Sequence, residues 1–437
     1  MTAAAFFAIL MLLFGIGLYV AVSMGLGALA LAAAFSDKSI VGAYGYIPWN
    51  TVTAVTFVAL PLFILMGELL LRSGTSSGMY NALSKWFGPL PGGLLHTNVA
   101  ACALFSCVSG SSAATAATVG RVSLPFMKKY HYPERMALGS LAAAGTLGIL
   151  IPPSITFIVY GIMTEQSVGK LYLAAMLPGL LMTVAYMALI FVDAKLKPQA
   201  AVRLPRAGWR EKAASLVALV PITVIMLIVL GTIYLGIATA SEAAAFGVTA
   251  AFALAWMNRK ISRAMLRETF LATAGTTAMI MFILLGAFVL QFVLALLGVP
   301  AALTQWVTGL GLGPVTIVLA ICAFYLVLGT FMEEISMVIM TIPVFLPMLK
   351  SLGVDLVWFG VVVVILVCAS IISPPVGVNL FVLQNLRKQI APKGQEPPIK
   401  DVFLGVLPFF AVTIVVLLIV VAFPQLSLWL PETAAAK

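Results

Sequence analysis

The chain has 437 residues, of which 62% are hydrophobic and 9% charged, and its formal net charge is +10. This composition excludes an ordinary soluble globular protein and indicates a polytopic membrane protein with on the order of ten passes. The basic residues lie in a few short loops, as the positive-inside rule expects, so the charge does not indicate nucleic-acid binding. Four cysteines within apolar segments and only two histidines argue against disulfides, a metal centre and an enzyme.

The first half opens with two apolar segments that flank a polar one. Residues 4–34 are expected to form either one long tilted helix or two short ones, and not a cleaved signal. Residues 36–50 carry tyrosines and a tryptophan and are expected at the membrane interface, before a span over 51–71. Residues 76–87 have apolar and aromatic side chains at helical spacing, which predicts an amphipathic arm in the interface.

A run of small and hydroxyl residues then interrupts a long uncharged stretch. Residues 94–127 are predicted to form a helical hairpin with its tip at Ser109-Gly110-Ser111-Ser112. Each limb has roughly 16 residues and is about 24 Å long, shorter than a hydrocarbon core of about 30 Å. The tip is therefore expected to stop inside the membrane, where a non-helical backbone must be buried in protein or line a cavity.

The next span, residues 137–164, contains a tandem proline. The break at Gly148–Ser154 includes Pro152 and Pro153, which remove backbone donors and leave upstream carbonyl groups free to bind a cation. Residues 170–192 then lead to a basic loop over 195–212. This loop is predicted to be cytoplasmic and to separate two halves of the chain.

The second half repeats this order of elements. Two short spans within 214–256 are hinged near Gly231 and Gly236, and a basic loop, a span over 270–293 and an arm with Trp306 follow. A hairpin over 314–349 has its tip at residues 329–334. A span over 356–386 is broken at Pro374-Pro375, and residues 401–423 form the last span. The basic loops near 263 and 387 can both be cytoplasmic only if the second hairpin opens outward, opposite to the first.

A weak internal repeat supports two inverted halves. Phe63–Gly67 resembles Phe282–Gly286, and the hairpin glycines Gly110 and Gly329 are separated by the same 219 residues. The double prolines that start at residues 152 and 374 are separated by 222 residues. Two inverted units, each with a broken hairpin, are typical of secondary transporters.

These landmarks divide the chain into six segments. They are first-half scaffold spans and an interfacial arm (1–90), a first transport unit of hairpin plus broken helix (91–165), a span and basic loop (166–213), second-half scaffold spans and arm (214–312), a second transport unit (313–386), and a basic loop, last span and C-terminus (387–437). The predicted fold is all-α, with two inverted repeats, two re-entrant helical hairpins and two broken helices.

Several motifs together resemble the large membrane subunit of TRAP transporters, the tripartite ATP-independent periplasmic class (DctM-like). The resemblance covers essentially the whole chain and depends on the segments Pro61–Gly67, Ser109–Ser112, Gly148–Ser154, Gly236–Ala245, Gly329–Glu333 and Pro374–Phe381. It implies an elevator mechanism and sodium-driven symport of an organic anion of C4-dicarboxylate, sugar-acid or sulfonate type across the bacterial inner membrane. It also implies a small DctQ-like membrane subunit and a DctP-like periplasmic binding protein as partners, with membrane lipid around the chain.

The sequence departs from the family pattern at two places. Arg121 occupies a position where a neutral residue is expected, and Glu333-Glu334 stands where many members have one acid. The acidic second tip favours a dicarboxylate-type member over the sialic-acid branch.

Sodium ions, with no other cofactor, are expected where each hairpin tip meets the broken span of its own half. Backbone carbonyls and hydroxyls near helix ends suit this cation. The alternative is that the small residues only permit close helix packing. The predicted sodium ligands are Ser109, Gly110, Ser112, Gly145, Gly148 and Ile151 at the first site and Gly329, Thr330, Ala369, Ser370 and Ser373 at the second.

The solute is expected at the helix N-termini of the two tips. Its predicted ligands are Ser111, Thr115, Ser154, Thr156 and Asn379, although Ser154 and Asn379 could instead cap backbone groups near the prolines. Glu68 is expected to pair with Arg72, and Glu242 either caps a helix or serves transport. The alternatives to a TRAP subunit are a stand-alone anion/sodium symporter and a channel of related fold.

Overall fold

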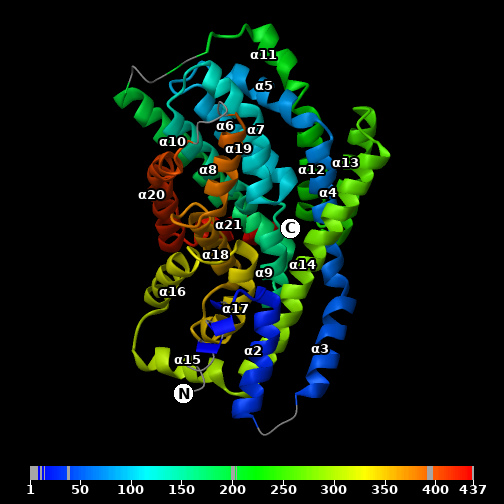
Figure 1. Cartoon of the computed structure of the whole chain (residues 1–437), viewed down its shortest axis with the longest axis vertical. Coiled ribbons are helices and arrows are strands. Elements are labelled where there is room, and N and C mark those ends of the chain that lie inside the picture. Colours follow the sequence, from blue (N-terminus) through cyan, green and yellow to red (C-terminus); the bar gives the residue numbers. More distant parts are fainter. Residues whose placement is uncertain are drawn as a thin grey trace.

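The computed structural model describes residues 8–9, 12–13, 15–36, 40–197, 202, 204–390 and 397–435. Within these ranges the chain is all-α, as predicted, and contains no strand (Figure 1). The first half comprises α2 (Val20–Phe35), α3 (Val41–Thr53), η1 (Val55–Val58), α4 (Ala59–Arg72), α5 (Thr75–Phe87), α6 (Leu94–Ser109), α7 (Ser112–Lys129), α8 (Glu134–Leu150), α9 (Ile155–Thr164) and α10 (Val168–Leu196). The second half comprises α11 (Trp209–Leu216), α12 (Val220–Tyr234), α13 (Ala240–Met257), α14 (Arg263–Leu296), α15 (Val299–Gly309), α16 (Pro314–Leu328), α17 (Glu334–Ser351), α18 (Leu356–Ser370), α19 (Val378–Ile390), α20 (Lys400–Ala422) and α21 (Gln425–Ala435).

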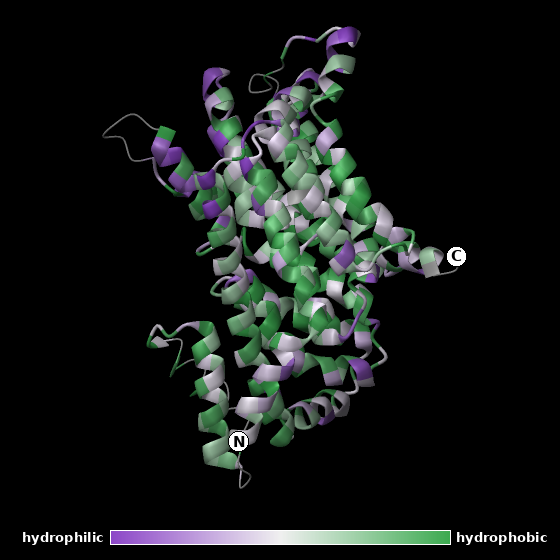
Figure 2. Cartoon of the chain, turned by 90° about the vertical axis from the view of Figure 1, so that its right-hand side faces the viewer, coloured by the Kyte–Doolittle hydropathy of each residue, from purple (hydrophilic) through white to green (hydrophobic). Residues whose placement is uncertain are grey.

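The helices are those of a multi-pass membrane protein. Among the described residues, six helices are long and apolar enough to cross a membrane, and the number rises to eight if each of two bent helix pairs is one span. Shorter apolar helices, including one limb of each hairpin, account for much of the remaining apolar sequence. Figure 2 shows hydrophilic residues concentrated at the upper end of the molecule, where several of the basic loops lie.

The N-terminal region agrees with the second of its two predicted alternatives, two short helices, in the part that the structure describes. Within the described part of residues 4–34, Gly17 makes a turn at φ +82° and the helix α2 begins at Val20, so a single uninterrupted helix is wrong. Residues 41–50 of the stretch expected at the interface, 36–50, form most of α3, which packs against α14. Tyr44 Oη donates a hydrogen bond to the carbonyl of Gly25. These contacts stabilise a helix in a segment that contains two glycines and a proline.

Both predicted hairpins are present. In the first, α6 and α7 are joined at Gly110, whose φ of +59° is a left-handed conformation that favours glycine. In the second, α16 and α17 are joined by residues 329–333. Figure 1 shows α6 and α7 in the upper half and α16 and α17 in the lower half, so the hairpins enter from opposite ends. This arrangement agrees with the predicted inversion of the two halves.

Both predicted broken spans are also present. The helices α8 and α9 are bent by 41° at residues 151–154, and α18 and α19 are separated by residues 371–377. The bonds Pro152-Pro153 and Pro374-Pro375 are both cis.

The two halves interlock through their hairpins. The helix α7 packs against α19 of the second half, and α17 packs against α9 of the first. Each hairpin also packs against the first limb of its own broken span, α8 or α18. The first tip is therefore largely enclosed by protein, as a non-helical backbone in a membrane must be, whereas the second tip leaves Phe331 74% exposed.

Charged contacts lie at the end that carries the basic loops. The arginine cluster comprises Arg135, Arg387, Glu134 and Asp401. Arg387 Nη2 lies 2.8 Å from Glu134 Oε2 and 3.2 Å from Asp401 Oδ2, and Arg135 Nε lies 2.9 Å from Asp401 Oδ1. Because the side chain of Arg387 is only 8% exposed, this cluster ties the ends of α8, α19 and α20 together.

A second contact docks α11 onto α5 at this end. The ammonium of Lys212 lies 5.5 Å from the ring centroid of Trp86 and 5.3 Å from that of Trp209. We call Trp86 and Trp209 the tryptophan pair. The residues that follow the last span form α21, which packs against α10 and α18.

Candidate solute and ion site

The first hairpin tip is organised by its own hydroxyl groups. Ser111 is the N-cap of α7, and its side chain accepts a hydrogen bond from the backbone N–H of Ala114. Ser109 Oγ lies 2.6 Å from Thr115 Oγ1, and Thr115 donates to the carbonyl of Ser111 at 2.9 Å. These bonds hold the tip in a fixed shape without any charged residue.

The first tip lies directly against the broken span of its own half. A Cβ added at Gly148 would lie 2.6 Å from the carbonyl oxygen of Ser111 and 2.7 Å from Thr115 Oγ1. A Cβ added at Gly110 would lie 3.2 Å from the carbonyl oxygen of Pro153. Any residue larger than glycine at position 148 would push the tip away from α8. The structure thus brings together most of the residues predicted for the first sodium site.

Ile151, the remaining residue predicted for the first sodium site, lies at the edge of this contact. It is the first residue after α8, with ψ of 122°, and its side chain lies against Gly179 of α10.

Asn379 joins this site from the second half. Its Nδ2 donates to Ser112 Oγ at 2.7 Å and to the carbonyl oxygen of Ala142 at 3.1 Å. A Cβ added at Gly145 would lie 3.1 Å from the same nitrogen. Because Asn379 bridges α7 and α8, the first site is built from both halves, whereas the sequence argument assigned each site to its own half alone.

The second tip lies against the end of α18. A Cβ added at Gly329 would lie 1.9 Å from Ser370 Oγ and 2.3 Å from Ser370 Cβ. Ser370 is buried and donates to the carbonyl of Leu366 at 2.9 Å. Gly329 is needed here for close approach, since its φ of −68° is ordinary, unlike that of its repeat partner Gly110.

The other residues predicted for the second site surround this contact. Thr330 donates to the carbonyl of Val327 at 2.7 Å, Ser373 N donates to the carbonyl of Ser370 at 3.0 Å, and Ala369 is fully buried in α18. Glu333 caps α17, because its Oε2 accepts from Ser336 N and Ser336 Oγ, each at 3.0 Å.

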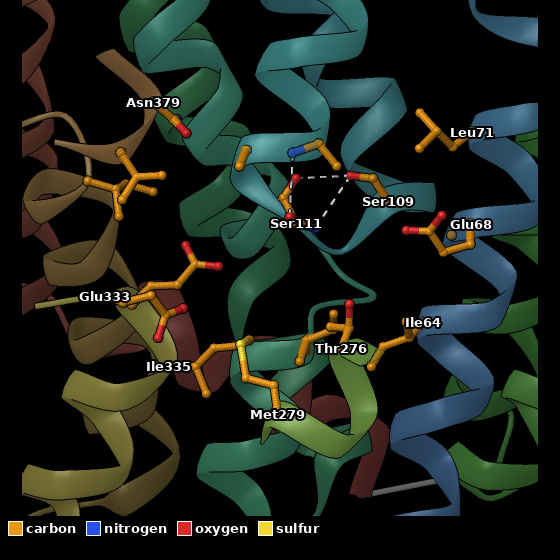
Figure 3. Close-up of a pocket in the computed structure, with 17 residues that line it drawn as sticks. Ile64, Glu68, Leu71, Ser109, Ser111, Thr276, Met279, Glu333, Ile335 and Asn379 are labelled. Carbon is orange, nitrogen blue, oxygen red and sulfur yellow. Dashed lines mark hydrogen bonds between the residues drawn. The ribbon is translucent and has the colours of Figure 1, made fainter. Parts of the chain in front are cut away.

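A cavity of about 220 Å³ lies where the two tips meet α4 and α14 (Figure 3). It is smaller than the roughly 300–1,000 Å³ usual for drug-sized ligands, so it suits a small solute. Its polar lining comes from both tips, the second broken span and the two outer helices, and the first broken span contributes Ile155. The lining residues are Ile64, Gly67, Glu68, Leu71, Ser109, Ser111, Ala113, Ala114, Ile155, Thr276, Met279, Glu333, Glu334, Ile335, Ile371, Val378 and Asn379.

The predicted solute ligands divide into two groups. Ser111 and Asn379 line the cavity. Thr115, Ser154 and Thr156 do not. Thr115 is used within the tip, and the hydroxyls of Ser154 and Thr156 are buried elsewhere without a hydrogen-bond partner among the described residues. Ser154 and Thr156 are each 1% exposed.

The intramembrane acids have distinct surroundings. Glu68 forms the predicted ion pair with Arg72, which also lies 3.7 Å from Glu268. Glu242 caps α13, since its Oε2 accepts from Thr239 N and Thr239 Oγ1, each at 2.8 Å. Arg121 is exposed on α7 and does not line the cavity.

Sequence reasoning missed the part of the lining that α4 and α14 supply. Glu68 could have been found as an intramembrane acid, which is a functional candidate by default. Thr276 and Met279 carry no such signal, because they lie in the long uncharged part of α14 and the register of this helix against the tips is set by packing.

Comparison with known families identifies the class of protein that this geometry belongs to. The family model described as "Tripartite ATP-independent periplasmic transporter, DctM component" matches residues 7–426. The C4-dicarboxylate TRAP transporter large permease protein DctM of Pseudomonas aeruginosa is 36% identical over 378 residues, covering 86% of each chain.

Two further relatives have other solutes in their names. The isethionate TRAP transporter permease protein DctMQ of Oleidesulfovibrio alaskensis is 31% identical over 95% of this chain, which spans 64% of that longer protein. The ectoine/5-hydroxyectoine TRAP transporter large permease protein UehC of Ruegeria pomeroyi is 30% identical over 87% of each chain. Among solved structures, the YdaH transporter of Alcanivorax borkumensis has the same overall fold, with a TM-score of 0.65 at 15% identity over 94% of this chain and 97% of that one.

Proposed function

We propose, because the chain belongs to the DctM family of tripartite ATP-independent periplasmic (TRAP) transporters, that it performs sodium-coupled uptake of a small organic acid across the bacterial inner membrane. The observation that carries the proposal is the cavity where the two opposed hairpin tips meet α4 and α14. The relatives are transporter permeases and not enzymes, and their names include C4-dicarboxylate, isethionate and ectoine.

The orientation follows from the basic residues. The end with the arginine cluster and the tryptophan pair carries most of the arginine and lysine residues, so it faces the cytoplasm. The first hairpin then opens to the cytoplasm and the second to the periplasm. A solute released by a periplasmic binding protein would enter from the open end of the second hairpin, where α16 begins and α17 ends, and a small membrane subunit would complete the complex.

Sodium is proposed at the two contacts between a tip and its broken span. The first contact offers the hydroxyls of Ser109 and Ser112 and the backbone carbonyls near Gly148, and the second offers Thr330 and Ser370 with the carbonyls at the end of α18. Each sodium ion that moves inward through about 100 mV adds about 2.3 kcal/mol of driving force.

The proposed movement is an elevator. The hairpins and broken spans, α6–α9 and α16–α19, interlock and would move as one hairpin body. The helices α4 and α14 pack against each other and form the opposite wall of the cavity. A site on the boundary between two such bodies can face either side of the membrane in turn when one slides past the other.

Uptake into proteoliposomes tests the proposal. The chain, reconstituted with its small subunit and supplied with the solute-loaded binding protein, should accumulate solute when sodium is imposed outside and not when choline replaces it. Sodium-dependent uptake without the binding protein would instead support a stand-alone symporter. Solute entry that follows only its own gradient would support a channel.

One variant connects this assay to the first tip. Ser112 is 1% exposed and accepts the hydrogen bond from Asn379, so Ser112→Leu should abolish sodium-dependent uptake. Ser77→Leu on the exposed face of α5 is the matched control and should retain uptake. Unchanged sodium dependence in Ser112→Leu would refute the placement of sodium at this tip.

A further inference from the structure

The cavity lining is acidic and lacks basic side chains. Three of the 17 residues that line it are glutamates, Glu68, Glu333 and Glu334, and none is lysine, arginine or histidine (Figure 3). The other polar side chains of the lining are Ser109, Ser111, Thr276 and Asn379. A cavity of this composition offers an anion no positive side chain.

The three carboxylates differ in the protein groups that already pair with them. Glu68 is paired with Arg72, and Glu333 accepts the N-terminal bonds of α17. Glu334 makes no hydrogen bond or ion pair with any residue in the part of the chain that the structure describes, and it is half-buried in the cavity wall. Glu334 is therefore the carboxylate that is available to a ligand.

Asn379 provides a second, independent acceptor. Its amide orientation is determined by the bond from Nδ2 to the carbonyl oxygen of Ala142, because a carbonyl can only accept. Oδ1 then has no donor among the described residues, although the side chain is only 1% exposed. A buried acceptor without a donor is costly, so its presence in a cavity wall points to a ligand that donates.

We propose that the solute is an organic acid that also carries a cationic nitrogen, that is, a zwitterion, and that its nitrogen binds at Glu334 and Asn379. This inference rests on the proposed transport function and narrows its solute class. The acid group of the solute would lie at the N-terminus of α7, where the first backbone N–H groups have no partner within the helix and the helix dipole favours an anion. The cationic and the anionic end of the solute then each contact groups of opposite charge or polarity within one small cavity.

Electrostatic interaction with Glu334 explains why the cavity prefers a zwitterion to a dicarboxylate. A dicarboxylate would place its second negative charge against Glu334 and the neighbouring Glu333, where like charges repel. An amine or ammonium in the same place gains a charge-assisted hydrogen bond to the carboxylate. The acidic second tip, which from family resemblance alone favoured a dicarboxylate, favours a zwitterion once the cavity is known.

Matched solute pairs test the inference on the unmodified chain. Binding to the purified chain in lipid nanodiscs, in sodium buffer, is measured by calorimetry for taurine against isethionate and for β-alanine against 3-hydroxypropionate. Members of each pair differ only by an ammonium in place of a hydroxyl. Ectoine and succinate extend the comparison. At least one ammonium member should bind tenfold or more tightly than its hydroxyl partner and than succinate.

Two variants connect the preference to its proposed cause. Glu334→Gln should reduce the tenfold preference to less than threefold and leave the sodium concentration for half-saturation unchanged. Glu211→Gln, the same change on an exposed residue of α11, should leave the preference intact.

Three results would overturn the inference. They are equal or tighter binding of the hydroxyl members or succinate, absence of binding by every ammonium member, and a shift of sodium half-saturation in Glu334→Gln with the preference unchanged. The last result would make sodium the occupant of these acceptors. Sodium-dependent binding of the hydroxyl acids or succinate that is as tight as that of the ammonium members, or tighter, would overturn only this inference, whereas absence of binding by every organic acid would overturn the proposed function as well.

Discussion

Gly329→Ala is the most direct perturbation of the second hairpin tip. The new methyl group would lie 1.9 Å from Ser370 Oγ and 2.3 Å from Ser370 Cβ. Rotation of the serine hydroxyl relieves only the first contact, because Cβ is attached to the backbone of α18. Insertion of a methyl group into a well-packed contact costs about 1–3 kcal/mol. If sodium binds only when the tip is seated, the same energy raises the sodium concentration for half-saturation by about 5- to 150-fold.

A double-mutant cycle isolates this contact. Ser370→Gly removes both atoms that collide with the new methyl group, so Gly329→Ala combined with Ser370→Gly should be less destabilised than the sum of the single changes by at least about 0.5 kcal/mol. The free energy of unfolding in mixed micelles and sodium-dependent tracer uptake are the two measurements. Gly309→Ala, where the added Cβ has no atom within 4 Å, is the matched control. Additive effects in the cycle, or wild-type sodium dependence in Gly329→Ala, would refute the reasoning.

Three further variants test other parts of the structure. Gly148→Ala places a methyl group 2.6 Å from a carbonyl oxygen of the first tip and should abolish sodium-dependent uptake. Gly231→Ala, whose added Cβ has no atom within 4 Å, should retain uptake. Equal uptake by both variants would contradict the close packing of the first tip against α8. Asp401→Asn removes the carboxylate that both arginines of the arginine cluster share and should lower the free energy of unfolding by about 1–3 kcal/mol, measured by denaturant titration. Lys212→Gln should cost less than about 1 kcal/mol and leave uptake unchanged, because its ammonium lies over the rings of the tryptophan pair, of which Trp209 is exposed. A large loss of uptake would show a role that the structure does not explain.

The hairpins and broken spans could be predicted because lipid imposes a strict rule on the backbone. A serine–glycine run or a tandem proline in a long uncharged segment has no helical hydrogen bonds of its own, so it must be enclosed by protein. Gly110 and Pro152 carry that signal in their residue type, and the internal repeat, at offsets of 219 and 222 residues, places their partners in the second half.

Other features depend on tertiary packing and could not be predicted from the sequence. The helix α3 forms from a segment rich in glycine and tyrosine because α14 packs along it, and α21 forms because α10 covers it. Asn379 was expected at a tip, but nothing in its own segment shows that it bridges Ser112 and Ala142 of the other half. The same holds for Thr276, which lines the cavity only because of the register between α14 and the hairpin body.

Simultaneous tracer counting of sodium and solute in the same proteoliposomes tests the central claim most directly. If the two tips hold solute and sodium in one enclosed site, sodium should enter only when solute is present, in a fixed ratio to it, and Gly148→Ala and Gly329→Ala should each abolish both fluxes. Solute uptake that carries no sodium, or sodium entry that proceeds without solute, would contradict the account.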